Sequence, residues 1–148
     1  MPAKIIASSD HAGTALRAVA VRAAAECGFE VTDVGPAAGA RAEYPGQARR
    51  VAEAVAAGDA RFGILVCGTG IGMSIAANKV RGVRAAVCTT EYEARMARAH
   101  NDANVLCLGE RVLGPGVCEG IVRAFLETAF EGGRHAERVR LLEEPERH

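Results

Sequence analysis

The chain has 148 residues, a length typical of one domain with a sizeable hydrophobic core. Small and aliphatic residues dominate, tryptophan is absent and only 4% of residues are aromatic, which favours an α/β layer fold over an all-β sandwich or barrel. Lysine plus arginine and aspartate plus glutamate number 18 each, so no overall charge attracts nucleic acid or a membrane surface.

Short apolar runs alternate with helical patterns along the whole chain. Strands are predicted where these runs occur, at residues 4–7, 30–34, 62–66, 83–88 and 105–108. Apolar residues at helical spacing predict helices between and after them, at residues 12–27, 44–57, 73–78, 91–100, 116–129 and from 134 onward. In the helix at 116–129, the side expected to be buried carries Val117, Ile121, Val122, Phe125 and Leu126.

Helix ends are marked by particular residues. Gly28 and Gly58 are expected to stop the first two helices, and Thr90 is a good N-cap for the helix after it. A Gly132-Gly133 break precedes the charged last helix. The repeated strand–helix order, with right-handed crossovers, predicts a five-stranded parallel sheet covered on both faces and a C-terminal helical tail, in one domain over residues 1–148.

A glycine-rich loop follows the third predicted strand. Cys67 ends that strand, and the loop consists of Gly68, Thr69, Gly70, Ile71 and Gly72. Three glycines in five residues let the backbone turn tightly, with N–H groups that favour an oxygen-centred negative charge. A cysteine beside such an anion site has a reason to ionise, and a thiolate is a base or a nucleophile.

Further polar residues stand where predicted elements end. Asp10 and His11 follow the first strand and Arg111 follows the fifth, at the carboxyl edge where open α/β sheets bind ligands. His100-Asn101 ends a helix instead. This pair must therefore reach the site by another route, for example from a neighbouring subunit.

Each candidate also has a purely structural interpretation. Asp10 could serve only as a helix cap, and His11 could be an exposed loop residue. Cys67 could be a small buried hydrophobe, as the other four cysteines are expected to be. His100 could interact only with the negative end of its helix.

Arg134 and Arg138 lie at i and i+4, on one face of the last predicted helix. A solvated charged face is the usual explanation, and two guanidiniums are also what a phosphate monoester needs. No Gly-Lys-Ser/Thr follows the glycine loop, and Met73 replaces the third glycine of the dinucleotide-binding pattern. A Cys-loop-Arg phosphatase would need an arginine at 73 or 74. A thiol, an anion site, two histidines and several arginines suit proton transfer next to a carbonyl on a phosphorylated small molecule.

Seven segments, in order along nearly the whole chain, match one family: SDHAG (9–13), EYP (43–45), CGTGIGMSIAANK (67–79), RAAVC (84–88), HND (100–102), GERV (109–112) and EGGRHAERV (131–139). They resemble the ribose-5-phosphate isomerases of type B, grouped with galactose-6-phosphate and allose-6-phosphate isomerases. The resemblance implies a three-layer Rossmann-like α/β/α sandwich. It also implies homodimers or dimers of dimers with sites shared between subunits, and a sugar-phosphate substrate.

The resemblance implies a role for most of these residues. Cys67 would be the base that moves a proton between C1 and C2, and His100 would be the acid that opens the furanose ring, assisted by Asp10 and Thr69. The amides of residues 68–72, with Asn101, would hold the enediolate oxygen. The implied phosphate ligands are His11, Arg111, Arg134 and Arg138. His100, Asn101 and the arginines would come from the partner chain, and the further substrate-binding positions are Tyr44, Gly68, Thr69, Gly70, Ile71, Gly72 and Ser74.

The sequence departs from the common family pattern at the sugar end of the site. Ser8 stands where glycine is frequent, and Gly46-Gln47 replaces an acidic or histidine residue followed by an aromatic. One branch of the family uses a glutamate directly after the glycine loop, where this chain has Met73, so the base must be Cys67. The reaction requires no metal or redox cofactor, since an aldose–ketose shift needs only acid, base and stabilised negative charge.

Three alternatives remain open at this point. One is the same chemistry on another four- to six-carbon sugar phosphate, such as erythrose 4-phosphate, allose 6-phosphate or galactose 6-phosphate. The others are a non-catalytic phosphosugar-binding module and a thiol-based redox or acyl-transfer enzyme. Five cysteines with no Cys-x-x-Cys pair, no apolar run of signal-peptide type and none of transmembrane length predict a cytoplasmic protein with free thiols.

Overall fold

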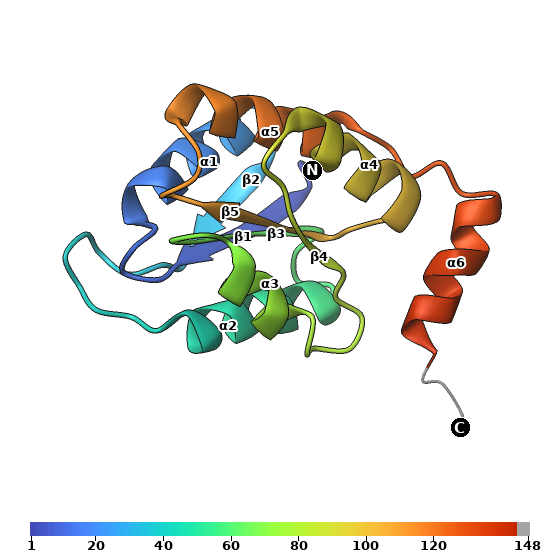
Figure 1. Ribbon diagram of the computed structural model, residues 1–148, viewed down its shortest axis with the longest axis horizontal. Helices are drawn as coiled ribbons and strands as arrows, with labels where there is room; N and C mark the ends of the chain where they lie inside the picture. Colours follow the sequence, from blue (N-terminus) through green and yellow to red (C-terminus); the bar gives the residue numbers. More distant parts are fainter. Residues whose placement is uncertain (145–148) are drawn as a thin grey trace.

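The computed structural model of the chain describes residues 1–144, which form a parallel five-stranded sheet between two layers of helices (Figure 1). The strands are β1 (Lys4–Ser9), β2 (Glu30–Asp33), β3 (Phe62–Cys67), β4 (Ala85–Val87) and β5 (Val105–Gly109), in the spatial order β2-β1-β3-β5-β4. The helices are α1 (Thr14–Glu26), α2 (Tyr44–Ala56), α3 (Ile71–Ala77), α4 (Glu91–Asn101), α5 (Pro115–Glu127) and α6 (Arg134–Glu143). The predicted three-layer parallel architecture is confirmed.

Helices cover both faces of the sheet. Figure 1 shows α1, α4 and α5 on one face and α2 and α3 on the other. Leu16, Ile121 and Phe125 belong to the core under the first group, and Val51 and Met73 to the core under the second. All six residues of β3 are buried, as an unbroken apolar run between two helical layers requires.

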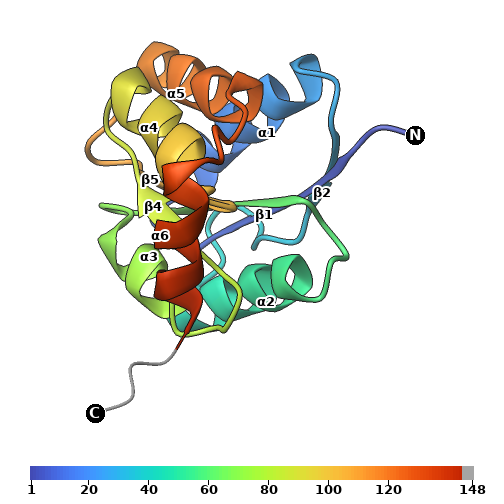
Figure 2. The same cartoon turned by 90° about the vertical axis from the view of Figure 1, so that its right-hand side faces the viewer.

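Helix α6 lies apart from this sandwich. Figures 1 and 2 show it beside the β4 edge, running past the end of α4 rather than over the sheet. His135 is its only buried residue within the described part of the chain. Gly132 and Gly133, with φ of +69° and +55°, form the predicted break before it. None of the helices within residues 1–144 has the length and apolar character that crossing a bilayer demands.

The sequence located the helix caps well and some boundaries less well. Thr90 is the N-cap of α4, with a complete capping box to Glu93, and Gly28 and Gly58 adopt the left-handed conformation. β1 runs two residues further than predicted, because Ser8 and Ser9 pair with Leu65 and Val66 of β3.

Three more predicted features differ in the structure. Helix α3 begins at Ile71, two residues early, because Gly70 (φ +81°) already turns the chain as the N-cap. Strand β4 covers only Ala85–Val87 of the six residues predicted for it. Val117 is 51% exposed, contrary to expectation, since it lies roughly a quarter turn from the centre of the buried stripe of α5.

Candidate active site

The topological switch point of the sheet, where a crevice is expected, lies between the carboxyl ends of β1 and β3. From β1 the chain goes to β2, which lies on the outer side of β1. From β3 it goes on to β4 and β5, which lie on the opposite side of the sheet, so the connections after β1 and β3 lead in opposite directions. Ligands of open α/β sheets bind at such a switch point. Ser9 pairs with Val66, which brings Asp10 next to Cys67, and the Asp10 amide donates to the Val66 carbonyl over 3.1 Å.

Cys67 is buried at the head of the glycine loop, with 5% of its surface exposed. The Gly70 amide donates a hydrogen bond to its sulfur over 3.1 Å. This bond fixes the position of the sulfur beside the backbone of the glycine loop. The local geometry is therefore compatible with a base or nucleophile at this position.

The other thiols are in different surroundings. Burial raises the pKa of Cys88 and of Cys118 to about 12, and burial raises the pKa of Cys107 as well. Cys27 is partly exposed, and its pKa is also raised, mainly by desolvation. All five cysteines are free, and these four keep their protons at neutral pH as small apolar side chains do.

The glycine loop packs closely against the backbone of β5. A Cβ on Gly109 would lie 2.7 Å from the carbonyl of Thr69, and one on Gly70 would lie 3.1 Å from the carbonyl carbon of Leu108. A Cβ on Gly72 would lie 2.6 Å from the ring of Tyr44, so this glycine leaves the space that the ring occupies. Tyr44 remains 40% exposed and thus forms part of the surface next to the loop.

The remaining loop hydroxyls are fixed locally. Thr69 Oγ1 accepts from the Ile71 amide over 3.3 Å, and Ser74 Oγ donates to the Ile71 carbonyl over 2.8 Å. Thr69 is exposed and Ser74 is half-buried, so both side chains lie near the surface of the loop.

Asp10 and His11 are held in the loop after β1. Asp10 Oδ1 accepts from the Ala12 amide over 2.9 Å, and Asp10 is 8% exposed. The His11 Nδ1 atom lies 2.9 Å from the Ala42 carbonyl oxygen, which fixes the ring against the loop before α2. The N-cap of α1 is Gly13, with no side-chain cap, so the interpretation of Asp10 as a simple helix cap is wrong.

The first turn of α1 is capped from elsewhere. Glu110, in the loop after β5, accepts a hydrogen bond from the Leu16 amide over 2.8 Å through Oε1. This role of Glu110 was not predictable from the sequence, because a partner 94 positions away leaves no local signal. Glu110 ties the loop after β5, which carries Arg111, to the helix that follows the Asp10 loop.

Arg111 lies against the glycine loop of its own chain. Its amide donates to the Gly68 carbonyl over 3.0 Å, and a Cβ on Gly68 would stand 3.3 Å from its Nη1 atom. The expectation that Arg111 comes from a partner chain together with Arg134 and Arg138 is therefore wrong. Arg111 follows β5 by two residues, and the carboxyl end of β5 lies next to the glycine loop after β3 of the same chain.

Within one chain, His100 and Cys67 lie at opposite ends of the parallel strands. Helix α4 returns from β4 and ends just before β5, whereas Cys67 pairs with Gly109 at the far end of β5. A strand rises about 3.3 Å per residue, so the length of β5 puts roughly 13 Å between the amino ends and the carboxyl ends of the strands. Asn101, Arg134 and Arg138 belong to the His100 side, on α4 and α6.

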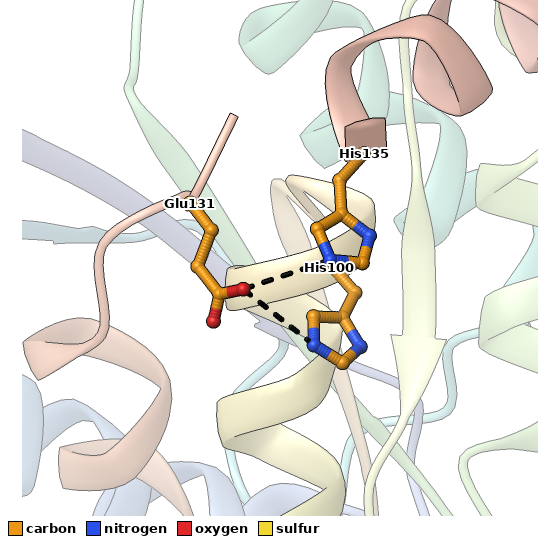
Figure 3. A group of neighbouring side chains, drawn as sticks. All are labelled: His100, Glu131 and His135. Atoms are coloured by element: carbon orange, nitrogen blue, oxygen red, sulfur yellow. Dashed lines mark ion pairs between the residues drawn. The ribbon is translucent and has the colours of Figure 1, made fainter. Parts of the chain in front are cut away.

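His100 stacks on a second histidine. The rings of His100 and His135 are parallel within 9°, with centroids 4.2 Å apart, and the Glu131 carboxylate faces both (Figure 3). Desolvation, and then the charges of His100 and Arg134, lower the pKa of His135. Neither Glu131 nor His135 was expected in the site from the sequence, although both lie in the segment EGGRHAERV (131–139).

The two departures from the family pattern touch each other. Ser8 is fully buried at the end of β1, and its hydroxyl donates to Gln47 Oε1 over 2.6 Å. Gln47 belongs to the first turn of α2, next to Tyr44. This pair borders the same crevice as Cys67 and Asp10.

Comparison with known proteins identifies the family. The family described as Ribose/Galactose Isomerase matches residues 5–142. The chain is similar to ribose-5-phosphate isomerase B of Escherichia coli (strain K12), with 48% identity over 94% of this chain and 93% of the relative. It is also 44% identical to a putative sugar phosphate isomerase of Bacillus subtilis (strain 168), over 92% of each chain.

Solved structures agree with this comparison over the whole fold. The type B ribose 5-phosphate isomerase of Trypanosoma brucei superimposes with a TM-score of 0.94 at 49% identity, covering 97% of this chain and 98% of the other. Ribose-5-phosphate isomerase B of Clostridium thermocellum superimposes with a TM-score of 0.91, also at 49% identity, over 95% of each chain. By its sequence and its fold, the chain belongs to the ribose/galactose isomerase family, among the relatives of type B.

Proposed function

We propose that this protein interconverts ribose 5-phosphate and ribulose 5-phosphate as an aldose–ketose isomerase. Its similarity over nearly full length to proteins named ribose-5-phosphate isomerase B supports this substrate and reaction. The observation that carries the chemistry is the sulfur of Cys67, which accepts the Gly70 amide 3.1 Å away beside the crevice between β1 and β3. The cytoplasm, which the free thiols of the sequence predict, is the location that we propose.

Cys67 acts as the base in this proposal. Its thiolate takes the proton from C2 of the open-chain aldose, the C–H electron pair forms the C1–C2 double bond, and the carbonyl oxygen becomes an enediolate oxygen. The C2 hydroxyl then passes its proton to the C1 oxygen while its O–H electron pair forms the C2=O bond, and the C1=C2 electron pair takes the proton back from Cys67 at C1, which gives the ketose. The amides of residues 68–72, with Asn101, hold the enediolate oxygen, and such donors are worth most in a site sheltered from water.

His100 acts as the acid that opens the furanose ring, since sugar phosphates exist mainly as closed rings and the shift needs a free carbonyl. It gives a proton to the ring oxygen, while Asp10 and Thr69 assist at the hydroxyl group on C1. The phosphate ligands are His11, Arg111, Arg134 and Arg138. A guanidinium binds two phosphate oxygens through two parallel hydrogen bonds, which fixes the position of the phosphate end of the substrate.

Two chains share each site in this proposal. His100 and Cys67 lie at opposite edges of one sheet, so one chain cannot apply both to a pentose, whereas a second chain can bring its α4–α6 side to the crevice. Large apolar side chains remain exposed next to both halves, namely Ile71 and Ile75 on α3 and Leu141 and Leu142 on α6. Burying such residues between copies stabilises a homodimer, or a dimer of dimers.

Replacing Cys67→Ala tests the base directly. The variant should lose turnover by at least about 10²-fold while still binding substrate, because the proton acceptor is gone and the phosphate ligands remain. Isothermal titration calorimetry with ribose 5-phosphate and a coupled assay of ribulose 5-phosphate measure the two properties. A variant with near-normal kcat would remove Cys67 from the reaction.

Mixing two inactive variants tests the shared site. Cys67→Ala and His100→Ala homodimers should both be inactive, but in mixed dimers one of the two sites combines an intact Cys67 with an intact His100. Random reassembly after joint unfolding and refolding should therefore restore about a quarter of wild-type activity. Each variant refolded alone is the control. No recovery in mixed dimers would mean that each chain supplies its own acid and base.

The same chemistry on another sugar phosphate is the second candidate. The Ser8–Gln47 hydrogen bond near Asp10 supports this candidate, because both residues depart from the common pattern of the family. A panel of erythrose 4-phosphate, ribose 5-phosphate, allose 6-phosphate and galactose 6-phosphate, compared by kcat/KM, distinguishes these substrates. A non-catalytic binding module would instead bind them without exchanging the C2 proton for solvent deuterium, and a covalent thiol enzyme would be trapped at Cys67.

A further inference from the structure

Three potential metal ligands converge where α4 ends and α6 begins. One nitrogen from each of His100 and His135 and one oxygen from Glu131 lie within 4.8 Å of one another. Figure 3 shows the carboxylate on the side of both rings that carries the facing nitrogen atoms. Two histidines and a glutamate are a donor set that zinc uses in proteins, with a fourth position left to water or substrate.

The two distances from the carboxylate to the imidazoles are close to those between ligands of one metal ion and too long for hydrogen bonds. Glu131 Oε1 lies 3.8 Å from His100 Nε2 and 3.6 Å from His135 Nε2. N–H···O hydrogen bonds measure about 2.7–3.2 Å, so neither contact is one. Bonds of about 2.0–2.2 Å to a tetrahedral ion place its ligand atoms roughly 3.3–3.5 Å apart, within a few tenths of an ångström of both distances.

The backbone positions these ligands before any ion arrives. The Glu131 amide donates to the Ala99 carbonyl over 3.0 Å, which fixes Glu131 beside His100. Gly132 and Gly133, both with positive φ, then turn the chain so that His135, whose amide donates to the Gly132 carbonyl over 3.0 Å, stacks on His100. A loop that needs two left-handed residues to face a carboxylate toward two imidazoles is a preorganised site.

The charges around the cluster act in opposite directions. His100 stands in the last turn of α4, where the negative end of the helix dipole favours a cation. Arg134 and Arg138 are the cations that face His135, and they weaken the binding of a metal ion. The balance suits an ion that binds and leaves, rather than a permanent structural zinc.

We propose that His100, Glu131 and His135 form a binding site for a divalent first-row metal ion, zinc foremost, and that the bound ion inhibits the enzyme by withdrawing His100 from ring opening. The inhibition rests on the proposed role of His100, whereas binding of the ion does not. Because the two imidazoles are parallel, they must tilt toward each other for both nitrogens to reach one ion. Their stacking is therefore lost in the bound form.

Cobalt(II) and zinc(II) added to the metal-free full-length protein test the site. Cobalt(II) should bind one per chain and give the visible absorption of a four- or five-coordinate ion, and zinc(II) should displace it. Glu131→Gln should weaken cobalt(II) binding at least tenfold, because a neutral amide oxygen is a much weaker metal ligand than a carboxylate. The matched control, Glu127→Gln, removes an exposed carboxylate from the end of α5 and should bind as the wild type does.

Two further measurements complete the test. Zinc(II) should lower kcat of the wild type reversibly, with recovery on adding EDTA, and Glu131→Gln should need at least ten times more zinc(II) for the same loss. Equal cobalt(II) affinity of wild type and Glu131→Gln, or loss of binding on Cys67→Ser alone, overturns the site. Full occupancy with unchanged kcat overturns the inhibition. A wild type without isomerase activity would contradict the proposed function and leave the cobalt(II) result intact.

Discussion

Cys67 differs from the other cysteines in the atoms around its sulfur. Its sulfur accepts the Gly70 amide at the switch point between β1 and β3, whereas burial raises the pKa values of Cys88, Cys107 and Cys118. The sequence predicted this contrast from the glycines that follow Cys67. A thiol's neighbours in the chain were informative here because the loop that surrounds it is only five residues long.

The glycine loop depends on one residue outside it. Gly109→Ala would place a methyl group 2.7 Å from the Thr69 carbonyl, so the loop must move away from β5. We expect kcat to fall by about 10²-fold, as a displacement near 1 Å at reacting groups does, with a stability loss of roughly 1–3 kcal/mol. Steady-state kinetics and urea unfolding measure the two effects.

Gly116→Ala is the control for this substitution. Gly116 lies in the first turn of α5, and a Cβ there meets no atom within 4 Å. Both kcat and stability should stay near wild-type values, within about 1 kcal/mol for the latter. Equal kinetic losses in the two variants would mean that close packing against β5 does not position the loop.

Helix α4 shows how an element carries a functional group to its place. Its capping box was predictable, since Thr90 and Glu93 stand three residues apart before an apolar pattern. Its C-terminal end, with His100 and Asn101, is held from outside, through the stacking of His135 and the Arg84 guanidinium on the Asn101 carbonyl. The position of His100 therefore depends on α6 as much as on α4.

Removal of the cap tests the contribution of the start of α4. Thr90→Ala deletes the oxygen that accepts the Glu93 amide, and we expect a loss of about 1 kcal/mol in the free energy of unfolding. Thr14→Ala is the control, because Thr14 starts α1 without acting as its cap, and it should change stability by less than about 0.5 kcal/mol. Urea denaturation followed by circular dichroism measures both, and equal losses would contradict a specific role for the cap.

At the scale of the whole molecule, buried thiols link stability to pH. The pKa of Cys88 and of Cys118 is raised from 9.0 to about 12 by burial, and that of Cys107 is raised too. Between pH 9 and 12 the unfolded chain releases these protons while the folded chain keeps them. The folded state should therefore lose up to about 1.4 kcal/mol per pH unit for each thiol above pH 9 and be unaffected by them at neutral pH.

Urea midpoints measured at half-unit steps from pH 7.5 to 10.5 check this prediction. Cys118→Ala should show a shallower decline than the wild type above pH 9, because one of the three buried thiols is missing. The comparison cancels the contributions of lysine and tyrosine, which both proteins share. Parallel declines in the two proteins would mean that Cys118 is accessible to solvent when the protein is folded.

Short-range patterns in the sequence determined the elements, their parallel order and the loop at Cys67. Periodicity, glycines and caps act over a few residues, so the chain from Lys4 to Glu143 folds locally much as the sequence predicts. One of the small errors lies where a distant partner extends an element, as when β3 extends β1 through Ser8 and Ser9.

Only the tertiary structure decided which functional groups meet. The bond from Leu16 to Glu110, the packing of Tyr44 on Gly72 and the meeting of His100 with Glu131 and His135 all join segments that are far apart in the sequence. The same holds for the assignment of Arg111 to its own chain's loop and for the separation of His100 from Cys67. These contacts follow from the strand order and from the packing of helices on the sheet, which sum many weak long-range interactions that no single segment encodes.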